Sequence, residues 1–390
     1  MVGAGPAPPL SISVLLVVRA SRPHISTFVR PSLPRRSPRA KPGRPHHKWR
    51  AGPVPRMIET DGALMNTSTD LDTLLAGIRN NDRAVLGRAI TLVESNSSDD
   101  RDLAQEFLTA LLPSTGGAHR IGISGVPGVG KSIFIESFGF RLIEAGHRVA
   151  VLAVDPSSSV SKGSILGDKT RMEKLAASDD AFIRPSPTAG SLGGVARKTR
   201  EAILVCEAAG YDVVLVETVG VGQSETTVAE MVDFFLLLKL AGAGDELQGI
   251  KRGILELADL ITINKADGDN LQAAELARAE FERALGILRS EDDWQPKVVT
   301  SSGRTGAGLD EIWQLIREHH KLLSDNGELE ERRSRQLLGW MWSLVDEGLR
   351  SAIREHPKVA DTLEALEQDV LEGRITATFA AERILGAFGG

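Results

Sequence analysis

The chain has 390 residues, of which 42% are hydrophobic and 25% are charged. These values exclude a largely disordered chain, and the length suggests two or three structural units. A net charge of −6 argues against a nucleic-acid binder built on a basic surface. The single cysteine, Cys206, excludes a disulfide framework and a cysteine-based metal site, and its apolar surroundings predict a buried structural thiol.

The N-terminal tail, residues 1–65, differs from the rest because it is rich in Arg, Pro and Ser and has no acidic residue before Glu59. A secretory signal is poorly supported, since no Lys or Arg precedes the apolar run at residues 10–18. The composition fits a mitochondrial transit peptide, although its prolines oppose an amphipathic helix. It fits equally a mis-set start or a disordered arm, with Met57 or Met65 as the true first residue. Composition does not choose between these two hypotheses, and the tail is excluded from the predicted fold.

The next region is predicted to be helical. Apolar residues recur at three and four positions, first over residues 71–78 and then over residues 85–93. Either Asn81 or Asp82 could cap the second helix. A stretch rich in helix breakers, residues 113–117, then leads into the following domain.

A glycine-rich stretch from Gly125 to Ser132 matches the P-loop pattern GxxxxGK[S/T] at every fixed position. A short apolar strand is predicted before it and a helix after it, which is the order that the motif requires. Glycines here can take positive φ and bring N–H groups to phosphate oxygens. Lys131 would place its ammonium among the β- and γ-phosphates, and the Ser132 hydroxyl could bind Mg²⁺. The predicted phosphate site comprises Gly125, Val126, Pro127, Gly128, Val129, Gly130, Lys131, Ser132 and Ile133.

Apolar strands alternate with helices after this loop. They are predicted at residues 149–154, 213–216, 234–238, 260–263 and 298–300. Continuous apolar runs separated by helices indicate an α/β fold with a parallel sheet covered on both faces. Ligand groups gather beyond the carboxyl ends of such strands. Asp155, Glu217 and Asn264 are expected there.

Acidic residues near two of these strand ends could serve a metal. A carboxylate there can hold Mg²⁺ directly or through water. Asp155 and Glu217 each follow the end of a predicted strand, and Asp168 lies between them in the sequence. Asp155 and Asp168 could instead cap helices. After Glu217, the loop at residues 221–225 could move on hydrolysis. No residue is an obvious arginine finger, so slow intrinsic turnover of the nucleoside triphosphate is expected.

The four residues Asn264-Lys265-Ala266-Asp267, here called the base motif, follow a predicted strand. The Asp267 carboxylate could accept hydrogen bonds from guanine N1–H and from its 2-amino group. Adenine offers neither donor and would leave the carboxylate unpaired, so the motif favours GTP over ATP. The residues Ser301-Ser302-Gly303 could offer backbone N–H groups to guanine O6.

The chain after Gly308 is predicted to be helical to its end. Apolar residues keep helical spacing over residues 332–354. Trp340 and Trp342 widen this apolar face, which could pack on the core or form a dimer contact. The expected regions are a tail (1–65), an N-terminal helical region (66–117), a GTPase domain (118–320) and a C-terminal arm (321–390).

Several long blocks carry a family resemblance. They are Gly125–Ser132, Val151–Ser158, Gly163–Met172, Ile183–Thr188, Glu217–Glu225 and Gly244–Gly253. With these blocks, the sequence resembles the MeaB/ArgK family of P-loop GTPases, which includes the methylmalonic aciduria type A protein of animal mitochondria. The resemblance runs from about Leu71 to the C-terminus, and the long blocks are far more specific than the P-loop alone.

The resemblance implies a homodimeric GTPase of the SIMIBI class that acts as a chaperone of adenosylcobalamin-dependent methylmalonyl-CoA mutase. GTP hydrolysis would gate delivery of the cofactor and protect or rescue the mutase. Residues 242–251 would couple the nucleotide state to the mutase, and the helices after Gly308 would form a dimerisation arm. The implied catalytic residues are Lys131, Glu217 and Gln223. The implied Mg²⁺ residues are Ser132, Asp155, Asp168 and Glu217, and the implied guanine site comprises Asn264, Lys265, Asp267, Ser302, Gly303 and Arg304.

The sequence departs from the family pattern at three positions. Ile133 replaces the usual Thr, which removes a hydroxyl near the α-phosphate. Lys162 stands where glycine is usual in the first switch segment and could slow its motion. Asn264 suits the prokaryotic branch, which favours the cytoplasm; the mitochondrial matrix is the alternative if the tail is a transit peptide. No apolar run reaches the length of a membrane span.

The residues also bear on three other functions. A metal-insertion GTPase would need a His- or Cys-rich segment, but His319 and His320 are adjacent on a predicted helix and face apart. A kinase for periplasmic amino-acid transport proteins is another label of this family, and the sequence shows no acceptor-binding feature for it. A protein that binds GTP without turnover stays open because no arginine finger is evident.

Overall fold

The computed structural model describes residues 67–154, 172–185, 192–218, 224–242, 252–287 and 293–389. The chain divides into two units, residues 1–62 and 63–390, and every described residue lies in the second. The boundaries of the four regions expected from the sequence stay a prediction.

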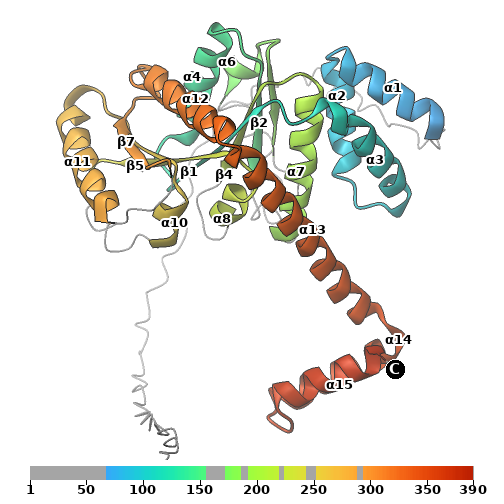
Figure 1. Cartoon of the computed structure of the whole chain (residues 1–390). Helices are drawn as coiled ribbons and strands as arrows, with labels where there is room; N and C mark the ends of the chain where they lie inside the picture. The colour runs from blue at the N-terminus through green and yellow to red at the C-terminus, as the bar shows by residue number, and fades with distance from the viewer. Residues whose placement is uncertain are drawn as a thin grey trace, which may run out of the picture. The chain divides into compact units, whose positions relative to one another are not determined.

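Among the described residues, seven strands form one sheet, and all neighbouring strands run parallel (Figure 1). Their order across the sheet is β3-β2-β4-β1-β5-β6-β7. The strands are β1 (His119–Gly125), β2 (Val149–Val154), β3 (Ala181–Arg184), β4 (Val213–Thr218), β5 (Phe234–Leu240), β6 (Leu260–Asn264) and β7 (Lys297–Thr300). The predicted α/β fold with a parallel sheet is confirmed.

Strand β3 was missed by the prediction, which placed six strands. It has only four residues, and it pairs with β2 alone at one edge of the sheet. Phe182 and Ile183 are buried, but an apolar run this short does not separate a strand from a loop. The prediction also ended β5 too early, because the strand continues to Leu240.

Helices cover both faces of the sheet, as the parallel arrangement requires (Figure 1). One core cluster lies between the sheet and α7, α8 and α11, and the other lies between the sheet and α4, α6 and α12. The helices before β4 are α1 (Thr67–Arg79), α2 (Arg83–Val93), α3 (Ser98–Leu111), α4 (Lys131–Glu144), α6 (Glu173–Ala176) and α7 (Leu192–Ala208). Those after β4 are α8 (Ser224–Ala229), α10 (Arg252–Leu257), α11 (Leu271–Ile287), α12 (Leu309–Asp325), α13 (Glu328–Glu355), α14 (Pro357–Leu371) and α15 (Ala377–Gly389). Short 3₁₀ turns occupy Leu112–Ser114 and Gly268–Asn270.

The N-terminal helices α1, α2 and α3 pack on one another and on α7. The cap of α2 is Asp82, whose Oδ1 accepts hydrogen bonds from the N–H groups of Ala84 and Val85 at 2.8 and 3.1 Å. Asn81 precedes the cap with a φ of 57° and does not replace it. Within α7, Cys206 is fully buried, and burial raises the pKa of its thiol. The predicted structural thiol is therefore confirmed.

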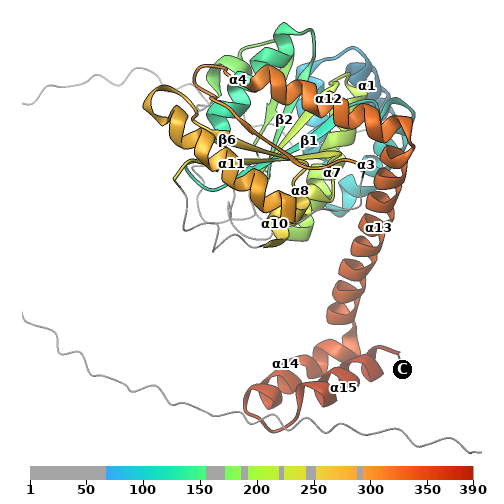
Figure 2. The same cartoon turned by 60° about the vertical axis from the view of Figure 1, so that its left-hand side comes forward.

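The long helix α13 is held to the core at its first turns. Arg333 makes two hydrogen bonds to the Asp233 carboxylate, at 2.9 and 2.6 Å. Farther along α13, the Trp340 ring lies under the guanidinium of Arg200, whereas Trp342 is 61% exposed. Helices α14 and α15 pack on each other and on α13 (Figure 2). No helix of the described residues is long and apolar enough to cross a membrane.

Candidate functional site

The P-loop joins the carboxyl end of β1 to the start of α4, so the predicted strand–loop–helix order is confirmed. Gly128 and Gly130 have φ values of 83° and 96°, which residues with side chains rarely adopt. At Gly125, a Cβ atom would lie 2.6 Å from the carbonyl oxygen of Leu238, so only glycine fits there. The loop can therefore turn its N–H groups toward an anion.

Lys131 is the charged residue of this loop, and its side chain is only 8% exposed. Its Nζ atom donates a hydrogen bond of 2.7 Å to the Gly125 carbonyl and contacts the Val126 carbonyl at 3.4 Å. Burial lowers the pKa of Lys131, while the carboxylates of Glu217 and Glu225 raise it.

The remaining loop residues divide between core and surface. The Val129 side chain is fully buried and anchors the loop in the core. Pro127 is exposed, and Ser132 is half-buried in the first turn of α4. Ile133 is 55% exposed, so an apolar side chain stands in the open where the family pattern has a hydroxyl.

The base motif lies directly against the P-loop. Asn264 ends β6, and its Nδ2 atom donates to the Val129 carbonyl at 2.9 Å. Lys265, with a φ of 61°, extends its Nζ atom to the Gly128 carbonyl at 2.8 Å. The motif and the loop are more than a hundred residues apart in sequence, yet the structure brings them together.

Residues 301–304 form the other side of the predicted base site. The Ser302 hydroxyl donates to the Asp267 carboxylate at 2.5 Å, and the Arg304 guanidinium lies 3.9 Å from that carboxylate. The Gly303 N–H donates to Asn264 Oδ1 at 3.2 Å. Ser302 and Arg304 therefore lie at the Asp267 carboxylate, whereas Asn264 and Lys265 contact the P-loop. The backbone N–H groups of residues 301–303, predicted to serve guanine O6, instead donate within the protein.

Two residues that support this arrangement, Ser137 and Thr262, escaped the sequence analysis, whereas Gly303 was predicted. Gly303 packs so closely on α4 that a Cβ atom would lie 2.8 Å from Phe134 Cα. The Ser137 hydroxyl donates to the Gly303 carbonyl at 2.5 Å. Beneath them, the Thr262 hydroxyl donates to Ser301 at 2.7 Å. These are single polar residues inside apolar elements, and no motif marks them.

The metal prediction can be tested only in part, because Asp155 and Asp168 lie outside the described residues. Lys162, Gln223 and residues 243–251 of the predicted coupling segment lie outside them as well. Ser132 and Glu217 are described and offer hydroxyl and carboxylate oxygens, which suit a hard cation such as Mg²⁺. No cluster of three or more His, Cys, Asp or Glu side chains that could hold a metal occurs in the described ranges. The donors present therefore fit a metal held partly by protein and partly by phosphate oxygens and water.

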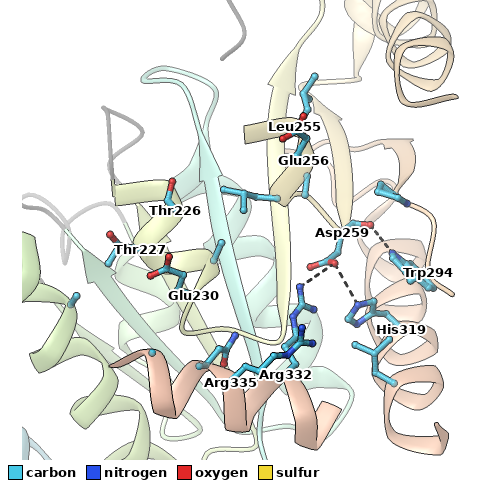
Figure 3. Close-up of a pocket in the computed structure, with 18 of the residues that line it drawn as sticks. Thr226, Thr227, Glu230, Leu255, Glu256, Asp259, Trp294, His319, Arg332 and Arg335 are labelled. Carbon is cyan, nitrogen blue, oxygen red and sulfur yellow. Dashed lines mark hydrogen bonds and ion pairs between the residues drawn. The ribbon is translucent and has the colours of Figure 1, made fainter. Parts of the chain in front are cut away.

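A large groove of about 2260 Å³ lies elsewhere, between α13 and the helices α8, α10 and α11 (Figure 3). None of the predicted site residues lines it. Arg332 crosses the groove, donating to the Asp233 carbonyl at 2.6 Å and approaching Asp259 at 3.6 Å. His319 also approaches Asp259, at 3.5 Å, while the His320 ring meets the His119 ring edge-on, so the two adjacent histidines do face apart.

Comparisons with known proteins agree with these features. Residues 86–358 match the family described as methylmalonyl Co-A mutase-associated GTPase MeaB. A GTPase of Caulobacter vibrioides is 56% identical over 326 residues, covering 83% of this chain and 100% of that protein. The mitochondrial methylmalonic aciduria type A homolog of Mus musculus is 47% identical over 343 residues, covering 84% and 82%. A crystal structure of a LAO/AO transport system kinase has a TM-score of 0.68 at 39% identity, covering 84% of this chain and 100% of that one.

Proposed function

The chain belongs to the MeaB family of GTPases and hydrolyses GTP, and on that premise we propose that it is a chaperone of adenosylcobalamin-dependent methylmalonyl-CoA mutase. Hydrolysis would gate loading of the cofactor and would protect or reactivate the mutase. The family description and the relatives named for methylmalonic aciduria support this proposal.

The observation that carries the proposed site is the hydrogen bond from Asn264 to the P-loop carbonyl of Val129. It ties the base motif to the P-loop, as a nucleotide that spans both would require. In the proposed site, residues 125–133 bind the phosphates and Lys131 stabilises charge that develops during hydrolysis. Asp267 and residues 302–304 bind guanine.

Magnesium is proposed as the partner of the triphosphate. Ser132 and Glu217 would hold it, with Asp155 and Asp168 completing the set. A bound Mg²⁺ supplies charge neutralisation at the β- and γ-phosphates. Gln223 is proposed to act in hydrolysis, as is Glu217.

We also propose a homodimer formed through the C-terminal arm, residues 321–390. Leu337, Leu338 and Met341 lie on one stretch of α13 and are about half exposed, as is Trp342. Apolar side chains at this density are seldom left to solvent, and they typically mark an interaction surface. A second copy of α13 would cover them. For the compartment, the cytoplasm is proposed, with the mitochondrial matrix as the alternative.

A second candidate function comes from the name of one similar structure, a LAO/AO transport system kinase.

The test of the chaperone proposal is a pull-down with purified methylmalonyl-CoA mutase, in the presence of either a non-hydrolysable GTP analogue or GDP. We expect the mutase to be retained and its retention to depend on the nucleotide. The matched control is Lys131→Ala, which should lose that dependence. If no mutase is retained in either state, the chaperone proposal fails, and transfer of the γ-phosphate to a transport protein becomes the alternative to assay.

A further inference from the structure

Glu225 is a buried acidic residue in the first turn of α8. Its side chain is 4% exposed, and its Oε2 atom has no hydrogen-bond donor among the described residues. Burying a carboxylate without a partner is costly, so such groups usually serve a charge or a ligand nearby. Glu225 therefore calls for an explanation beyond packing.

Because α8 packs on β1, Glu225 lies at the end of the sheet where the P-loop begins. A Cβ atom at Gly122 would lie 2.9 Å from Val228 Cγ1, so α8 touches β1 there. Val228 follows Glu225 by three residues and shares its helix face, while Ser124 follows Gly122 by two and shares its sheet face. Because β4 and β5 both run parallel to β1, the helix between them runs the opposite way. Its first turn therefore lies at the carboxyl end of β1, where the P-loop begins.

The positive charge that this carboxylate would attract is the Lys131 ammonium. The hydrogen bonds that the structure shows for it, to Gly125 and Val126, end on neutral carbonyl oxygens. Gly125 is the last residue of β1, so its bond to Lys131 places the ammonium at the same end of the strand as the first turn of α8. A buried carboxylate at this end would attract the ammonium before the phosphates arrive.

We propose that Glu225 is a positioning residue for GTP hydrolysis, which attracts the Lys131 ammonium from the first turn of α8 and competes for it with the nucleotide phosphates. In the free protein the carboxylate attracts Lys131, and in the complex it repels the phosphates. Both effects weaken nucleotide binding. GTP carries one phosphate more than GDP, so the effect is larger for GTP. Glu225 thereby destabilises the bound ground state, which favours turnover over tight binding.

The test replaces Glu225 by Gln, which removes the charge and keeps the shape. Affinities for GTP and GDP would be measured with Mg²⁺ and fluorescent nucleotide analogues, and kcat and KM in the same buffer. We expect the Kd for GTP to fall about 3- to 10-fold and the Kd for GDP to fall less. KM and kcat should fall together, because relief of ground-state repulsion has that signature. A structural role alone would lower stability and would not tighten binding.

Glu230→Gln is the matched control. Glu230 is exposed and comes directly after α8, and the substitution removes the same charge. Its constants should equal those of the wild type. A GTP affinity of Glu225→Gln that is unchanged or weaker would overturn the proposal. Should Glu225→Gln fail to fold, Glu225→Asp is the second test of the proposal. Its side chain is one methylene shorter, which moves the carboxylate away from Lys131. It should tighten GTP binding by about twofold, and an unchanged affinity would overturn the proposal equally.

Discussion

The Asn264 side chain donates a hydrogen bond of 2.9 Å to the carbonyl oxygen of Val129, across 135 residues of sequence. Its other amide atom, Oδ1, accepts the N–H of Gly303 at 3.2 Å. One buried amide thus fixes the distance between the P-loop and both halves of the base site. In the proposed site, the positions of phosphate and base would therefore be set together before the nucleotide binds.

Replacing Asn264 by Ala should damage the fold and the site at once. It leaves the Val129 carbonyl and the Gly303 N–H buried without partners, which should lower the free energy of unfolding by about 1–3 kcal/mol. GTP affinity should fall as well, because the two halves of the site are no longer tied. Urea unfolding and nucleotide titration measure both effects. Asn270→Ala removes an exposed amide that bonds to Lys265 and serves as the control; equal losses in both variants would contradict the bridging role.

Asp267→Asn should change the preference for the base. The carboxylate accepts from Ser302 and, in the proposed site, from guanine, whereas an amide presents a donor in place of one acceptor. Discrimination of guanine over adenine should fall by about tenfold or more. Xanthine, which has a carbonyl where guanine has its amino group, should gain affinity. Competition binding with GTP, ATP and XTP checks this, with the exposed Asp269→Asn as control. If the preference for guanine survives, another group reads the base.

Trp342→Asp and Leu338→Asp should disrupt the proposed dimer. Each places a charge in an apolar surface that a second α13 would cover, and a buried unpaired charge strongly opposes association. Light scattering should show a shift from dimer to monomer, while GTP affinity stays near that of the wild type. The control is Glu331→Gln, a polar change on the same helix. A wild-type mass for both aspartate variants would rule out α13 as the interface.

The stability of the fold should fall in mild acid because of His119. Burial, together with the charge of His320, lowers the pKa of His119 from 6.5 to about 4, against the raising effect of Asp233. Between these pH values the unfolded chain binds a proton that the folded protein excludes, so stability decreases as the pH falls. The loss through this residue should be about 1–3 kcal/mol.

Urea unfolding of the wild type and of His119→Asn, at about pH 7 and pH 4.5, isolates that contribution. The variant lacks the titrating imidazole, so its stability should depend less steeply on pH. Parallel pH profiles for the two proteins would show that His119 does not cause the loss.

The interior strands could be predicted because parallel strands buried on both faces appear as unbroken apolar runs, as in Val213–Val216. Strand β3 could not, since a four-residue edge strand leaves too short a run. The place of Asn264 at a strand end was predicted from the sequence. Its hydrogen bond to Val129 depends on the path of two loops, which no local sequence pattern shows. Helical spacing likewise placed Trp340 and Trp342 near one apolar face without showing that one meets Arg200 and the other meets solvent.

The most direct test of the site is calorimetric titration of GTP, with Mg²⁺, into the wild type and into Lys131→Ala. The wild type should bind one GTP per chain. The variant should lose binding or turnover, because it lacks the ammonium that meets the phosphates, while its unfolding temperature shows that it is folded. A folded Lys131→Ala protein that binds and hydrolyses GTP like the wild type would contradict the assignment of this loop to the triphosphate.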